Sequence, residues 1–305
     1  MKIKVQTIKV LSLIIVISVF VKCSPDGSKS SDNDSDNKEL IIENEDIGQL
    51  YNETYFRFPS PEEIFNFISK TQLIYKEGLV NPNRNKDKYI NTLSQSLNLG
   101  IYSSDLAYLT LLEKHNESLD YFEATYYLSE KLRISSAFNE PIIERVKKNL
   151  DNVDSLIRIS NDAYKEIVDY LTNNNKEKTL ALMSIGGFIE SMHIAVNMVE
   201  KYNDDNPIIQ SIADQKFALE NLYLFAKQYK DDENVSVALE LLYQLKTVYN
   251  EIEEVNVGKT KLEKTKDNKL VLSGGVKLKM SSKQFSKLKE IITQTRNKIV
   301  NNQLN

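Results

Sequence analysis

The sequence has few of the residues that most often carry chemistry. Its 305 residues include one cysteine, two histidines and no tryptophan. One cysteine excludes an intramolecular disulfide, and two histidines leave few ways to build a hydrolytic triad or a histidine-rich metal site. The chain also has no G-x-S-x-G sequence. We therefore expect a protein that is not an enzyme, although an enzyme that relies on carboxylates stays open.

Glycine and proline are also scarce, at nine and six residues. Folds made of β-strands need many turns rich in these residues, so their scarcity favours long helices. From Ser60 onward the apolar residues recur at helical spacing, and capping residues mark most boundaries. The sequence predicts an all-α fold, built as a multi-helix bundle or as stacked α-hairpins.

The predicted helices follow from these apolar stripes and caps. They are expected over residues 61–77, 89–100, 104–112, 117–132, from 141 onward, and over 156–171, 178–201, 207–225, 237–252 and 285–299. In this prediction Gly100 ends one helix and Asn116 caps another. Asn206 and Pro207 form a helix start, with a capping residue followed by proline at the first helical position.

Residues 259–280 break the helical pattern. Apolar residues alternate there with lysines, and turn signals stand at Asp267-Asn268 and at Gly274-Gly275. Alternation with a period of two, interrupted by such turns, is typical of β-hairpins. We predict a small β insertion here, before a C-terminal helix that a capping box from Ser281 to Gln284 begins.

The N-terminal residues have the organisation of an export signal. Lys2, Lys4 and Lys9 precede an uncharged stretch over residues 10–21. A helix of that length spans roughly 18 Å, which is short of a hydrocarbon core of about 30 Å. Such a segment is typical of a signal peptide rather than of a spanning helix. We therefore assign residues 1–22 to a leader.

The single cysteine, Cys23, follows this leader directly. The arrangement resembles a bacterial lipoprotein signal, which implies a lipid on Cys23 and anchoring in the outer membrane. In that pattern a small residue precedes the cysteine, whereas Lys22 stands there in this chain. An ordinary secretory leader is the alternative, but no A-x-A-like cleavage site lies nearby.

Residues 24–46 consist largely of serine, aspartate, asparagine and lysine. They offer too little apolar surface to offset the entropy of ordering, so we expect a disordered acidic tether over residues 23–58. The acidic tract is similar to signals that carry lipoproteins of Bacteroidota to the cell surface. The periplasmic face and the cell surface both stay open as locations. The folded domain is expected over residues 59–305.

The stretch "IGGFIESMH" is the strongest internal candidate for a site. Gly186 and Gly187 lie inside an apolar helix, where each costs about 1 kcal/mol relative to alanine. Another helix is therefore expected to cross closely at this point.

Glu190 and His193 follow on the same helix, at the i, i+3 spacing of Glu-x-x-His metal sites. Such sites need a second pair, and His115 is the only other histidine of the chain. We therefore expect no metal and no cofactor, and a contact between Glu190 and His193 that serves packing or lines a small-ligand pocket. Carboxylates near these two residues are the groups of the enzymatic alternative.

The charge balance bears on the partners. The formal net charge is −4, and removal of the four lysines of the leader leaves about −8. An acidic surface repels phosphates, so no nucleic-acid partner is expected. The run "DYFEATYY" suits stacking against a glycan or a peptide, although aromatic residues at helical spacing more often form core.

Three further stretches carry a resemblance. They are "LNLGIYSSDLAYLTLLEKHNESLDYFEATYYLSEKL" at 97–132, "NLDNVDSL" at 149–156 and "LMSIGGFIES" at 182–191. Together they resemble a group of uncharacterised helical lipoproteins of Bacteroidota. The resemblance implies a lipoprotein with a helical domain and implies no activity. The expected function is a lipid-anchored binding or scaffold module for a protein, a peptide or a glycan.

Overall fold

Two long helices, α3 (Thr92–Leu111) and α7 (Glu177–Met198), form the centre of the fold. The computed structural model describes residues 73–138, 140–149, 152–258, 261–264, 270–273 and 276–304. Within these residues, α3 and α7 share the most extensive contact of any two elements. Most of the side chains of both helices are buried, which explains why neither has a polar face.

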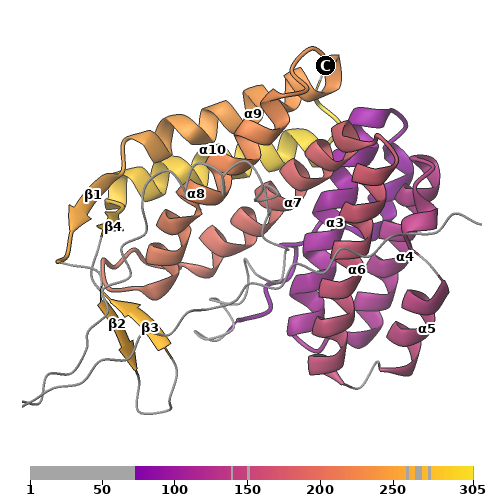
Figure 1. Ribbon diagram of the computed structural model, residues 1–305, viewed down its shortest axis with the longest axis horizontal. Helices are drawn as coiled ribbons and strands as arrows, with labels where there is room; N and C mark the ends of the chain where they lie inside the picture. The colour runs from indigo at the N-terminus through magenta and orange to yellow at the C-terminus, as the bar shows by residue number, and fades with distance from the viewer. Residues whose placement is uncertain are drawn as a thin grey trace, which may run out of the picture. The chain divides into compact units, whose positions relative to one another are not determined.

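The other helices surround this central pair, and all of them except α5 pack on it directly (Figure 1). They are α4 (His115–Lys131), α5 (Glu140–Lys148), α6 (Val153–Asn173), α8 (Pro207–Lys227), α9 (Glu233–Asn250) and α10 (Ser282–Val300), with the 3-10 turns η1 (Asn83–Lys88) and η2 (Ser135–Ala137). Helices α4 and α6 pack on α3, and α5 packs on α6. Helices α8, α9 and α10 pack on α7.

The prediction of an all-α fold with a small β insertion is confirmed. Strand β1 (Glu253–Asn256) pairs with β4 (Val276–Lys279), and β2 (Lys261–Lys264) pairs with β3 (Leu270–Ser273), both antiparallel. Leu278 of β4 is buried and β4 contacts α8, so the pair formed by β1 and β4 packs on the helices. Strand β1 precedes the predicted insertion, in residues that directly follow α9.

Two predicted helix starts are confirmed by their capping hydrogen bonds. The Asn206 side chain accepts from the Ile208 N–H at 2.9 Å, and Pro207 is the first residue of α8. At the start of α10, the Ser281 hydroxyl accepts from the Gln284 N–H while the Gln284 side chain accepts from the Ser281 N–H. Both arrangements satisfy N–H groups that have no partner inside the helix.

Three other predicted boundaries are wrong. Residues 73–77 are not helical, and the remainder of the helix predicted over 61–77 lies outside the described residues. Helix α3 continues through Gly100, and Asn116 lies inside α4, whose N-cap residue is Lys114. The expected break between residues 100 and 104 therefore does not exist, because a single helix spans it.

The true end of α3 carries no glycine. The chain turns at Glu113, whose φ of 57° is in the left-handed region. The Lys114 N–H donates to the Leu109 carbonyl at 3.0 Å, which is the long hydrogen bond of a Schellman motif. A glutamate at the position where glycine is usual gives no sequence signal for a helix end.

Among the described residues, only α7 has the length and apolar composition to cross a membrane. The surrounding helices bury 94% of its apolar window inside the protein. The role of α7 as the central helix accounts for this composition.

Candidate functional site

The four residues singled out on α7 lie in the interior of the helical domain. Gly186, Gly187 and Glu190 are buried, and His193 is 7% exposed. The glycines pack against α3, whereas Glu190 forms an ion pair with a residue of α10.

The glycines of α7 meet α3 at Gly100. A Cβ atom on Gly186 would lie 1.9 Å from the Leu97 carbonyl oxygen, and a Cβ atom on Gly100 would lie 1.9 Å from the Met183 carbonyl oxygen. These distances are far below van der Waals contact, so both positions require glycine. At Gly187 a Cβ atom would meet nothing closer than 3.5 Å. The close crossing expected from the sequence therefore depends on Gly186 and on Gly100, which lies inside α3 rather than at the predicted helix end.

Glu190 forms an ion pair with Arg296 of α10. The Arg296 Nε donates to Glu190 Oε2 at 2.9 Å, and its Nη2 donates to Oε1 at 3.1 Å. Arg296 Nη2 also donates to the Leu79 carbonyl at 3.2 Å. A bidentate ion pair of this kind fixes the orientation of both side chains. It ties α7, α10 and the segment before η1 together.

His193 has a different partner. Its carbonyl accepts from the Asn197 side chain at 2.8 Å, and its Nδ1 lies 3.4 Å from the same Asn197 nitrogen. Burial lowers the pKa of His193, which favours the neutral imidazole. The hydrogen bonds described for Glu190 go to Arg296 rather than to His193.

Asp105 of α3 completes a cluster of three ionisable groups. Burial raises the pKa of Asp105 well above its usual value, and the charge of Glu190 raises it further. Its Oδ2 accepts from the Asn81 N–H at 3.0 Å, whereas no donor among the described residues reaches Oδ1. The raised pKa favours a protonated Asp105, and the cluster of Asp105, Glu190 and Arg296 is then neutral.

Hydrogen bonds from Asn81 extend this cluster. Asn81 Nδ2 donates to the Tyr89 hydroxyl at 3.0 Å and to Asn98 Oδ1 at 3.3 Å. The Tyr89 hydroxyl donates to the Val300 carbonyl at 3.1 Å. Burial raises the pKa of Tyr89 to about 12, so the hydroxyl stays protonated and can donate. The network joins α3, α7, α10 and the segment before η1 inside the core. Its geometry is that of a set of contacts that holds helices together.

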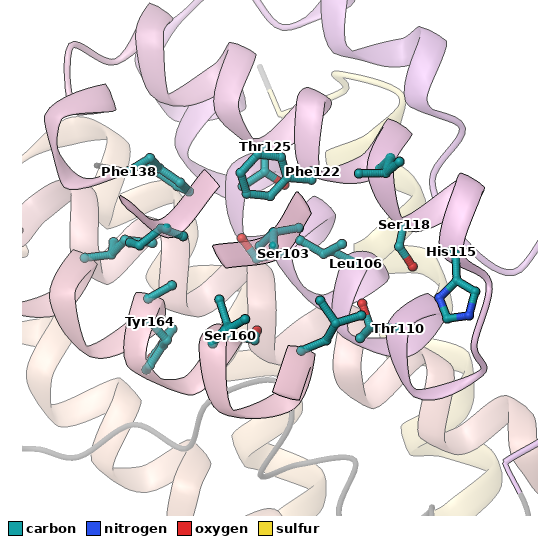
Figure 2. A pocket seen from close by; sticks show the side chains of 17 residues that line it. Ser103, Leu106, Thr110, His115, Ser118, Phe122, Thr125, Phe138, Ser160 and Tyr164 are labelled. Carbon is teal, nitrogen blue, oxygen red and sulfur yellow. The ribbon is translucent and has the colours of Figure 1, made fainter. Parts of the chain in front are cut away.

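A cavity of about 100 Å³ lies elsewhere, between α3, α4, α5 and α6 (Figure 2). We call it the α4 pocket. Most of its wall is apolar. The apolar wall includes Leu106, Phe122, Phe138, Ile142, Leu156 and Ile159. Neither Glu190 nor His193 lines it.

Three of the polar residues that line the α4 pocket lie at one end of it. Figure 2 shows Thr110, Ser118 and His115 together at that end, with Phe138 and Tyr164 at the other. We call the first three the polar end. The Ser118 hydroxyl is buried and has no hydrogen-bond partner among the described residues. The sequence suggests His115 only as a second metal ligand, and the structure places it in this pocket.

A second hollow of about 280 Å³ adjoins the α4 pocket. The two share Leu119, Phe122 and Val146. Tyr126 and Tyr127, from the aromatic run of α4, also line the second hollow, whereas Tyr121 of the same run is buried in the core. The Lys131 Nζ lies 5.0 Å from the centre of the Tyr127 ring, so a cation already covers that ring.

The α4 pocket had a weak signal in the sequence. Its walls come from faces of α3, α4 and α6 that alternate large apolar residues with Ser103, Thr125, Ser160 and Ala163. Small residues at core-facing positions leave space only if neighbouring side chains do not fill it, and that depends on the packing of four helices. For this reason the apolar stripes predicted the helices and did not predict the pocket.

The described residues contain no group of three or more histidine, cysteine, aspartate or glutamate side chains that would hold a metal ion. Cys23 and the leader lie outside the described residues. Comparison of the chain with models of protein families, with curated proteins and with solved structures gave no match. The site is therefore argued from its own geometry.

Proposed function

We propose that the protein is a binding module of the cell envelope that takes up a small apolar ligand in the α4 pocket. In this proposal a lipid on Cys23 holds the chain at the outer membrane, as in the group of helical lipoproteins of Bacteroidota that the sequence resembles. The apolar cavity between α3, α4, α5 and α6 carries the proposal.

The cavity has an energetic cost that a ligand would offset. Protein interiors are close-packed, and an empty core cavity costs on the order of 24 cal/mol per Å³. The α4 pocket is partly open to solvent, so its cost lies below the roughly 2 kcal/mol of a closed cavity of about 100 Å³. Apolar cavities of comparable size stay dry and bind small apolar molecules. A ligand that fills the space replaces the missing contacts.

The location of the ionisable groups favours binding over catalysis. Glu190 and His193 line neither the α4 pocket nor the adjoining hollow. Glu190 is engaged with Arg296 and Asp105 in a network that holds helices together. Our proposal therefore gives these residues a structural role. Binding of a protein, a peptide or a glycan, which the sequence also suggests, would use surfaces outside the α4 pocket.

Calorimetric titration of the full chain with octanol tests the proposal. Ser160 lines the α4 pocket from α6, and Ser160→Phe places a ring in the cavity. We expect octanol to bind the unaltered chain and to bind Ser160→Phe at least tenfold more weakly. A loss of that size corresponds to about 1.4 kcal/mol.

The matched control is Ser236→Phe, because Ser236 is an exposed residue of α9, outside both hollows. It adds the same ring to a helix and should leave octanol binding unchanged. Because non-specific uptake of octanol is the same for both variants, the difference between them reports binding in the α4 pocket. Equal binding by Ser160→Phe and the unaltered chain would contradict the proposal.

A further inference from the structure

The Ser118 hydroxyl at the polar end has no partner that the described residues supply. Ser118 is 7% exposed, its Oγ is buried, and its side chain lines the α4 pocket. A buried hydroxyl without a hydrogen bond destabilises a protein by about 1–3 kcal/mol. A ligand that hydrogen-bonds to this hydroxyl would remove that cost.

The N-terminus of α4 lies at the same end, because His115 is its first residue. Lys114 is the N-cap residue and makes no side-chain capping hydrogen bond. The first N–H groups of a helix have no partner inside the helix, and the helix dipole makes this end positive. An acceptor with negative charge is the group best suited to this end.

Glu117, in the first turn of α4, does not place a negative charge in the pocket. Successive helical residues are about 100° apart, so Glu117 lies roughly 140° around the axis from Phe122. Phe122 lines the pocket, whereas Glu117 does not. The imidazole of His115 and the hydroxyls of Thr110 and Ser118 are therefore the side-chain groups that face a ligand head at this end (Figure 2).

We infer that the ligand of the α4 pocket is a monocarboxylic acid with a hydrocarbon chain. Its carboxylate accepts hydrogen bonds from Ser118, from His115 and from the start of α4. Its chain lies along α4 toward Phe122 and leaves over Leu119 into the adjoining hollow. The pocket face of α4 from residue 115 to residue 125 is about 15 Å long, which suits a chain of medium length. This inference rests on the proposed function.

Titration of the full chain with octanoate and with octanol distinguishes binding of an apolar chain from recognition of a carboxylate. We expect octanoate to bind at least tenfold more tightly than octanol. Ser118→Ala should weaken octanoate binding about tenfold and should reduce the preference for octanoate over octanol. His115→Gln should act in the same direction. The control Ser236→Ala, on the exposed surface of α9, should leave both affinities unchanged.

The stability of unliganded Ser118→Ala gives a second readout. Removal of a buried hydroxyl that has no partner should leave the Tm equal or raise it, so weaker binding cannot come from misfolding. Octanol binding equal to or tighter than octanoate binding would overturn the inference and leave the proposed function standing. Equal octanoate binding by Ser118→Ala and the unaltered chain would also overturn it. Binding of neither probe would overturn both claims.

Discussion

The Asp105 carboxyl group has no exposed surface and lies beside Glu190 and Arg296. Burial raises its pKa, with a further increase from the negative charge of Glu190. Two carboxylates and one guanidinium would leave a net negative charge in the core, which is costly. A proton on Asp105 removes that charge and supplies a donor to Glu190. The state of this residue is set by two neighbours that lie far from it in the sequence.

We expect Asp105→Asn to imitate the protonated carboxyl group, because the amide can donate to Glu190 and accept from the Asn81 N–H. A group whose pKa is higher in the folded state contributes stability at low pH that is lost as the pH rises. The loss begins near the pKa of a free aspartate, about 3.9, and ends at the pKa in the folded protein.

The variant lacks this loss, so its advantage over the unaltered chain should grow by about 1.4 kcal/mol per pH unit within that window. Chemical denaturation at a series of pH values measures the difference, and groups common to both chains cancel. Asp105→Ala should be less stable than Asp105→Asn at every pH, since the hydrogen bond to the Asn81 N–H is lost. A difference between Asp105→Asn and the unaltered chain that does not change with pH would contradict this account.

At the scale of the elements, the crossing of α3 and α7 shows where sequence reasoning held and where it failed. Two glycines inside an apolar helix predicted a close crossing at Gly186, and the structure has one. The same reasoning read Gly100 as a helix end. Local propensity is the same for a glycine that ends a helix and for one that meets a partner. Only the packing of α7 against α3 distinguishes them.

The two adjacent glycines of α7 give a matched pair of variants. Gly186→Ala would drive a Cβ atom into the Leu97 carbonyl and should lower the free energy of unfolding by about 3 kcal/mol. Gly187→Ala meets only ordinary contacts at 3.5 Å and removes a helix-breaking residue. It should be neutral or stabilise by up to about 1 kcal/mol. Thermal and chemical denaturation measure both, and similar effects of the two substitutions would argue against the crossing geometry.

At the scale of the whole molecule, the pocket and the anchor belong together in the proposed function. An apolar acid partitions into lipid, so a pocket held near a membrane surface encounters its ligand there at high local concentration. The anchor depends on Cys23, which lies outside the described residues. It stays a prediction from the leader and from the resemblance to lipoproteins.

We expect Cys23→Ala to abolish incorporation of labelled palmitate by cells that express the full chain. Lys22→Ala is the matched variant, because it introduces the small residue that the lipoprotein pattern has before the cysteine. It should label at least as well as the unaltered chain. Labelling of Cys23→Ala would contradict the anchor. Protease treatment of intact cells distinguishes the two locations, since only a surface-exposed domain would be digested.

The sequence by itself determined the fold class, most helices and the starts of α8 and α10. These features depend on periodicity and on capping within a few residues, and both can be read along the chain. The tertiary structure alone decided that Asp105, Glu190 and Arg296 meet, and that Ser118 faces a cavity. Glu190 and Arg296 are separated by 106 residues. A contact across that distance, like a space between four helices, depends on how the helices pack against one another.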